Sequence, residues 1–168
     1  MVKRVSLGAV ECPVARALDV IGDWWSLLII RDAFDGISRF SRFQKNLGIA
    51  KGMLTARLQE LVRRGVLEVR PASDGSAYQE YALTPKGRDL FKVLVALRQW
   101  GEDHLYAPGE PHSTLVETTT GEPVSRLELR SRNGVDLAWS ETAVRKHHGS
   151  NAGRGGSTGK RHNDTRSP

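Results

Sequence analysis

Apolar side chains recur at intervals of three and four residues through the first third of the chain, a spacing that predicts amphipathic helices. The first helix begins at Pro13, which suits a first helical turn, and it ends at Gly22. Asp23 is a good N-cap for a second helix over about 24–34. Because this second helix is apolar almost all round, we expect it at the centre of a core.

Two further helices are predicted after a short extended link. One covers about 41–47, with Ser41 as its cap and Gly48 as the residue that breaks it. The other runs from about 51 to 64, and Gly65 follows it where a C′ glycine is expected. The apolar face of this fourth helix consists of Leu54, Leu58, Leu61 and Val62.

A hairpin and a long helix follow the fourth helix. Residues 66–70 read as a strand, and residues 78–83 alternate well enough to be the returning strand after a turn centred on Asp-Gly. A threonine cap and a proline then open a helix over about 84–105. This helix carries more large apolar side chains than one thin domain can cover.

The rest of the chain carries weaker signals. Strand-like stretches at 115–119, 126–130 and 135–139, the last two joined by a turn at Asn133-Gly134, predict a small β-rich extension. From about His147 the composition turns to Gly, Ser, Asn, Arg and Lys without periodicity, which is typical of disorder. The expected organisation is a mobile arm (1–10), a helical domain with a hairpin (11–106), the β-rich extension (107–146) and a disordered basic tail (147–168).

Positive charge is concentrated in two parts of the sequence, and the formal net charge is +6. Residues 37–70 hold eight Lys/Arg against two Glu, and more acidic stretches flank them. Such a block favours a face that binds a polyanion, although a solvated helix surface is the alternative. The tail is the second basic block, and it could add nonspecific affinity for DNA.

Several classes of protein are disfavoured by what the sequence lacks. Cys12 is the only cysteine, so no intramolecular disulfide can form, which fits a reducing cytoplasm. No apolar run approaches the ~18–20 residues that cross a bilayer, and no signal-peptide h-region follows the N-terminal charges. The sequence has no phosphate-binding glycine loop, nucleophile elbow or zinc-protease motif. We therefore expect no enzyme activity, no cofactor, no metal site and no membrane partner.

The order of helix, turn, helix, hairpin and long helix is that of a winged helix-turn-helix, an α+β fold that is mainly α with a two-stranded wing. In this fold the fourth helix would enter the major groove of double-stranded DNA, the third would brace it, and the hairpin would reach phosphates or an adjacent groove. The alternative is a module that grips a partner protein and whose basic face is incidental. The residues expected to contact DNA are Lys51, Gly52, Thr55, Ala56, Arg57 and Gln59 on the fourth helix, Arg39, Ser41 and Arg42 at the start of the third, and Ser73, Ser76 and Gln79 in the wing.

Several blocks of sequence, in order, resemble the HxlR-type family of winged helix-turn-helix transcriptional regulators. The resemblance covers about residues 11–105 and implies a cytoplasmic homodimer that binds pseudo-palindromic operators. It departs from the family at Ala50, where a capping serine is common, and the absence of any cysteine after Cys12 excludes the zinc ribbon of some relatives. The blocks are Cys12-Pro13-Val14, Asp23-Trp24-Trp25-Ser26-Leu27-Leu28, Arg39-Phe40-Ser41, Leu54-Thr55-Ala56-Arg57-Leu58 and Tyr81-Ala82-Leu83-Thr84-Pro85-Lys86-Gly87.

The resemblance also implies a dimer interface and a sensing site. The first helix and the long last helix would build the dimer, in keeping with the excess apolar surface of the latter. Some family members sense oxidants or electrophiles through a cysteine that Cys12 matches, although a cysteine packed at a helix cap is the alternative. Trp24 and Trp25 could line a pocket for a small-molecule effector, or they could belong to the core. The expected interface residues are Val14, Leu18, Leu90, Leu94, Leu97 and Trp100.

Overall fold

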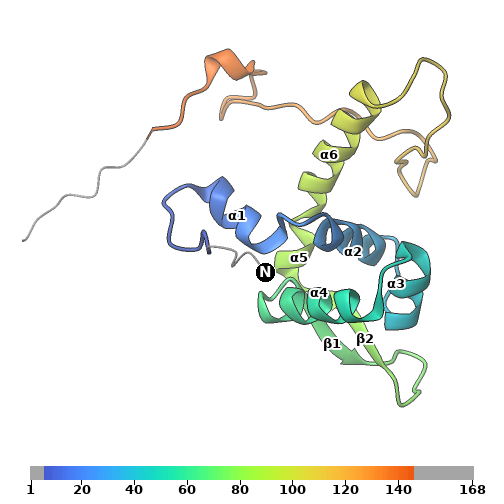
Figure 1. Cartoon of the computed structure of the whole chain (residues 1–168). Coiled ribbons are helices and arrows are strands. Elements are labelled where there is room, and N and C mark those ends of the chain that lie inside the picture. The colour runs from blue at the N-terminus through green and yellow to red at the C-terminus, as the bar shows by residue number, and fades with distance from the viewer. Residues whose placement is uncertain (1–5, 146–168) are drawn as a thin grey trace, which may run out of the picture. The chain divides into compact units, whose positions relative to one another are not determined.

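The structure is a computed structural model that describes residues 6–145 (Figure 1). The chain forms two compact units, one ending at Leu127 and the other beginning at Glu128. The expected basic tail at 147–168 and the first half of the expected arm lie outside the described residues. The first unit contains α1 (Pro13–Ile21), α2 (Trp24–Phe34), α3 (Phe40–Leu47), α4 (Lys51–Arg63), β1 (Leu67–Pro71), β2 (Gln79–Leu83), α5 (Pro85–Arg88) and α6 (Phe91–His104).

Helix α2 lies at the centre of the first unit, as its all-round apolar surface predicts. It contacts α1, α3, α4, α6 and β2. Ile29 and Ile30 on α2 are fully buried, together with Phe43 on α3. Three leucines of α4 complete this core, namely Leu54, Leu58 and Leu61. Helices α3 and α4 therefore pack against one central helix through their apolar faces.

Side chains that were expected to cap helices do so at two of three places. Asp23 accepts a hydrogen bond from the backbone N–H of Ser26 (3.0 Å), and Thr84 accepts one from Gly87 (3.0 Å). The expected Ser41 cap is wrong, because α3 begins one residue earlier than predicted and Arg39 takes the N-cap position. Ser41 consequently lies within the first turn of α3, where it is exposed.

The long helix expected over 84–105 is interrupted. Helix α5 ends at Arg88, and α6 starts at Phe91 after a step in which Leu90 N–H bonds to Gly87 C=O (3.1 Å). Gly87 of α5 lies against the residue before β1, where an added Cβ would be only 2.2 Å from the backbone oxygen of Val66. Two helices separated by Asp89 and Leu90 therefore replace the single helix that was expected.

The two strands form the expected antiparallel hairpin, which we call the wing. Leu67 pairs with Leu83 at its base and Pro71 with Gln79 at its far end. The turn beyond contains Gly75 at φ +73°, a left-handed conformation that suits glycine. The N–H of Tyr81 also donates to Ser38 C=O (2.8 Å), which joins the wing to the link before α3.

The extension needs a correction, because the stretches expected as strands at 115–119, 126–130 and 135–139 form no strand in the described residues. Isolated antiparallel bridges take their place, Val116 with Pro123 in the first unit and Arg130 with Asp136 in the second. Most side chains here are exposed, so little apolar burial supports a longer ladder. The end of the third stretch instead forms a short 3₁₀ helix, Trp139–Glu141.

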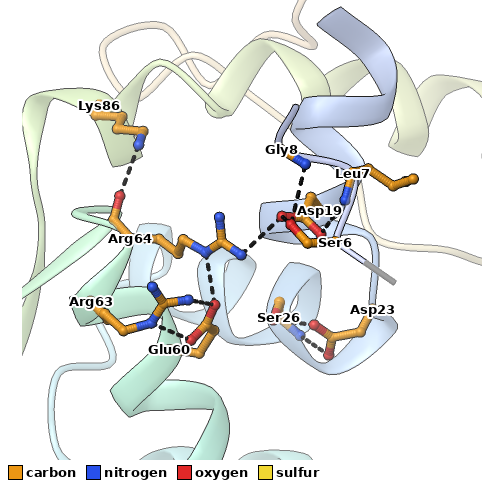
Figure 2. Close-up of polar contacts among 10 residues, drawn as sticks. All are labelled: Ser6, Leu7, Gly8, Asp19, Asp23, Ser26, Glu60, Arg63, Arg64 and Lys86. Carbon is orange, nitrogen blue, oxygen red and sulfur yellow. Dashed lines mark hydrogen bonds and ion pairs between the residues drawn. The ribbon is translucent and has the colours of Figure 1, made fainter. Parts of the chain in front are cut away.

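Polar contacts join α1 to the end of α4 (Figure 2). The Arg64 guanidinium donates to Asp19 (3.0 Å) and to Glu60 (2.8 Å), and Arg63 also donates to Glu60 (2.8 Å). Hydrogen bonds from Arg63 and then Arg64 lower the pKa of Glu60 from 4.5 to about 2. The N–H of Leu7 and the hydroxyl of Ser6 donate to Asp19, and the Leu7 bond is the main reason that the pKa of Asp19 is lowered.

The contact at Gly87 can be tested with a matched pair of glycine-to-alanine variants. We expect Gly87→Ala to destabilise the fold by roughly 1–3 kcal/mol, because the new methyl group would force α5 away from β1. Gly101→Ala is the control, since Gly101 lies in α6 with no atom within 4 Å of its added Cβ. It should stabilise by about 0.5–1 kcal/mol through helix propensity. Urea unfolding measures both, and an equal effect in the two variants would contradict the steric account.

The lowered pKa of Glu60 predicts that the variant Glu60→Gln loses stability to an extent that depends on pH. Folding favours the charged carboxylate, so its contribution is present above the ordinary pKa of 4.5 and is lost as the pH falls towards about 2. Near neutral pH, we expect the free energy of unfolding of the wild type to exceed that of the variant by about 1 kcal/mol or less, as for other partly exposed ion pairs. Unfolding measured between pH 6 and about 2.5 should show this difference shrinking. A difference that stays constant over this range would contradict the assignment.

Candidate nucleic-acid interface

A helix-turn-helix is built by α3, a tight turn and α4. Gly48 ends α3 in the left-handed region at φ +61°, and its N–H donates to Gln44 C=O (3.0 Å). Ile49 is buried beneath the turn, and Ala50 takes the N-cap position of α4. Alanine has no side-chain acceptor, so the first N–H groups of α4 receive no cap from it. They are donors that an anion at this end of the helix could use.

The side of α4 opposite its three buried leucines carries two very small side chains and one glutamine, with the exposed Arg63 at its far end. Gly52, Ala56 and Gln59 are exposed, as predicted, and Lys51 is exposed at the start of the helix. Thr55 is half-buried, and its hydroxyl donates to Lys51 C=O (2.9 Å), so the oxygen remains available only as an acceptor. Because Gly52 and Ala56 project almost no side chain, another molecule can approach the backbone of α4 closely.

Most arginines of the basic block are paired with carboxylates rather than free. Arg57 lies 3.2 Å from Asp23, Arg63 and Arg64 share Glu60, and Arg70 pairs with Glu68. Arg39 contacts Asp74 (2.5 Å) and Glu80 (3.4 Å) in the wing. Arg42, Lys45 and Lys51, by contrast, pair with no carboxylate among residues 6–145. The uncompensated positive charge of the block therefore sits on α3 and at the start of α4.

Arg39, at the N-cap of α3, connects that helix to the wing through its ion pairs with Asp74 and Glu80. Ser76 and then the Arg39 guanidinium lower the pKa of Asp74 from 3.8 to about 2, so this acid stays charged. Of the predicted wing contacts, Gln79 and Ser73 are exposed and Ser76 is half-buried. The Ser73 hydroxyl donates to Glu80 (3.3 Å). The structure thus brings Arg39 and the wing serines together, but it turns the Arg39 guanidinium towards acids of its own chain.

The residues predicted for the dimer interface divide into two groups. Val14 (66% exposed), Leu97 (48%) and Trp100 (57%) present large apolar surface, and Leu18 is about half exposed. Leu90 and Leu94 are half-buried because they pack against the core of their own unit. The apolar surface on α1 and α6 is what the sequence led us to expect, and its covering by a second copy stays a prediction.

The predicted sensing and effector residues lie at the start of the first two helices. Cys12 is exposed at the N-cap of α1, and oxidant sensing through it stays a prediction. Trp24 is exposed and stacks on the partly buried Trp25 with ring centroids 4.3 Å apart. Within the described residues, no cluster of His, Cys, Asp and Glu could hold a metal ion. None of the helices there combines the length and the apolarity that crossing a bilayer requires.

Three features of this surface were missed by sequence reasoning. Met53 is 41% exposed at the start of α4, although a methionine reads as core. Lys45 on α3 pairs with no carboxylate in the described part of the chain, and the spacing of Arg42 and Lys45 at i, i+3 could have indicated a shared face. Asp19 and Arg64 are 45 residues apart in the chain, and no local pattern could have paired them.

Comparisons with known proteins identify the family. Residues 20–108 match the model of the HxlR-like helix-turn-helix family. The HTH-type transcriptional regulator MT3179 of Mycobacterium tuberculosis is 44% identical over 109 residues, which are 65% of this chain and 69% of the relative. The crystal structure of PA1607 aligns with a TM-score of 0.79 at 56% identity, over 83% of this chain and 98% of that one. The redox regulator HypR in its oxidized form aligns with a TM-score of 0.52 at 33% identity, over 57% of this chain and 100% of that one.

The family model spans α2, the whole helix-turn-helix, the wing and α6, and it begins near the end of α1. The chain therefore belongs to the HxlR-like helix-turn-helix family of transcriptional regulators.

Proposed function

We propose that the protein is a sequence-specific regulator that binds double-stranded DNA as a homodimer in the cytoplasm. The observation that carries the proposal is the bare face of α4, which lies opposite three fully buried leucines and begins with an uncapped helix end. A helix that is packed on one side only, and whose exposed side carries very small side chains, can enter a major groove about 12 Å wide.

Base reading would rest on the middle of α4. Gln59 can form two hydrogen bonds with adenine, the hydroxyl oxygen of Thr55 can accept one from a base, and Met53 can contact a thymine methyl group. Gly52 and Ala56 add almost no bulk, so the helix backbone can come close to base edges or phosphates. These contacts would give the complex its sequence preference.

Phosphate binding would rest on the free cations and on the two ends of the surface. Arg42, Lys45 and Lys51 can each neutralise a phosphate, and such contacts make binding salt-dependent. Ser41, Ser73, Ser76 and Gln79 can add neutral hydrogen bonds to the backbone. Arg57 and Arg39 would act indirectly, since Asp23 and the wing acids already hold their guanidinium groups.

Dimerisation is supported by the apolar surface of α1 and α6. Val14, Leu97 and Trp100 are large, exposed and apolar, and their burial against a second copy would remove them from water. A twofold dimer would present two copies of α4 to half-sites one duplex turn apart, about 34–36 Å.

Gly52→Ala tests whether the exposed side of α4 contacts DNA (we call this side the reading face). The substitution should change DNA binding and stability in opposite directions. No atom lies within 4 Å of an added Cβ, so the variant should be about 0.5–1 kcal/mol more stable than wild type. We expect it to bind a duplex selected by the wild-type protein roughly tenfold more weakly, because the methyl group would meet the DNA; this corresponds to about 1.4 kcal/mol.

Gly101→Ala is the matched control, since it adds the same methyl group to an open position on α6. Fluorescence anisotropy with the selected duplex measures both variants. Unchanged affinity in Gly52→Ala would argue against the reading face. If the wild-type protein enriches no sequence from a random pool, the regulator would have to act as a protein-binding module instead.

Leu97→Asp tests the dimer. A carboxylate on the apolar surface of α6 would have to be buried on association, so we expect at least a tenfold weaker dimer by analytical ultracentrifugation. Val69→Asp is the control, because it makes the same change at an exposed apolar position in β1 of the wing. Equal dimer strength in wild type and Leu97→Asp would place the dimer elsewhere.

A further inference from the structure

The segment before α1 is folded back onto that helix at two points. The side chain of Asp19 accepts hydrogen bonds from the Leu7 N–H (3.2 Å) and the Ser6 hydroxyl (3.1 Å). Arg16 donates to the Val10 carbonyl (2.5 Å), nearer the start of the helix. The segment is thus attached along one side of α1 and is not a free arm.

The same carboxylate extends the attachment to α4 (Figure 2). Asp19 accepts from Arg64, which caps the end of α4 and also pairs with Glu60 one turn earlier. The side chain of Asp19 is only 5% exposed, so its charge depends on these donors for compensation. Lys86 of α5 in turn donates to the Arg64 carbonyl (2.8 Å), which brings a further element to this point.

A second acid joins the α1–α2 corner to α4. Asp23 at the start of α2 lies 3.2 Å from Arg57, which is two helical turns before Arg64. Arg57, Glu60 and Arg64 follow each other at spacings of three and four, so they lie on one side of α4. This row of charges runs beside the bare face of the helix.

The contact along this row is polar and loosely filled. A hollow of about 340 Å³ lies there, lined by Asp19, Asp23, Arg57, Arg64 and the exposed Ala56 among others. Close-packed side chains would fix the position of a helix by shape, but here the ion pairs must supply the constraint. The angle of α4 on this side consequently depends on Asp19 and its partners.

We propose that Asp19 is a positioning residue for DNA reading, which holds α4 at the angle that its base contacts require by joining the segment at Ser6 and Leu7 to Arg64. The segment before α1 is then a working part of the DNA-reading unit without touching DNA. This inference rests on the proposed function, and it adds that specificity depends on residues remote from the bases.

The first test compares Asp19→Asn with Asp35→Asn in the full chain. Both changes remove one negative charge, but Asp35 is exposed at the end of α2, and its side chain makes no hydrogen bond or ion pair among residues 6–145. Affinities are measured for a duplex that the wild-type protein has selected from a random pool and for a random-sequence duplex. We expect Asp19→Asn to lower the ratio of specific to nonspecific affinity about tenfold, and Asp35→Asn to leave the ratio unchanged.

The ratio separates positioning from simple loss of folded protein, because a smaller folded fraction lowers both affinities equally. Asp19→Glu, which keeps the charge, should recover part of the ratio. An unchanged ratio in a folded Asp19→Asn would overturn the inference while leaving the proposed function intact. Failure of the wild-type protein to select any duplex would instead remove the proposed function.

A second variant covers the case in which Asp19→Asn does not fold. The double variant Ser6→Ala with Leu7→Pro removes the two donors of the segment and leaves the Asp19–Arg64 pair in place. We expect a fall of threefold or more in the same ratio, with dimerisation unchanged. A ratio equal to that of wild type would show that the segment takes no part in DNA reading.

Discussion

The burial of Leu54, Leu58 and Leu61 against α2 is the constraint on which the rest of the molecule depends. These side chains are fully excluded from water, and each is worth roughly 1.5–3 kcal/mol of transfer free energy. Their burial fixes the rotation of α4 about its own axis, so the opposite side of the helix must face outwards. The glycine and alanine on that side are useful only because the leucines determine where they point.

Charge acts on this surface differently from what composition alone indicates. The basic block of 37–70 is strongly positive when it is counted, yet its arginines mostly hold the fold together through acids of the same chain. Arg39 connects the wing, while Arg57 and Arg64 connect the α1–α2 corner. The residues left to attract a polyanion are fewer and lie closer to the start of α4. Ion pairing within the chain therefore restricts the uncompensated positive charge of this block to α3 and the start of α4.

Sequence reasoning succeeded where a local rule decides the outcome. Asp23, Gly48, Gly65 and Thr84 act through their own backbone geometry or one nearby hydrogen bond, so the ends of the helices beside them could be predicted. The exposure of Gly52, Ala56 and Gln59 followed from helical periodicity, which the buried leucines obey. The family resemblance reached the same order of elements independently.

It failed where the outcome depends on distant partners. The close approach of Gly87 to the carbonyl of Val66 joins residues 21 apart in the chain, and Asp19 and Arg64 are 45 residues apart. The strand-like stretches of the extension leave most of their side chains exposed, so they form only isolated bridges.

The link between Arg39 and the wing acids has a consequence for the kind of DNA that such a protein prefers. With α3 and the wing joined by ion pairs and by the Tyr81–Ser38 hydrogen bond, the two outer contact points keep one separation. A duplex that meets both must adapt its own groove width and curvature to that span. Flexible pyrimidine–purine steps between the contact points would lower the elastic cost, and binding sites would then be selected partly by the stiffness of bases that the protein never touches.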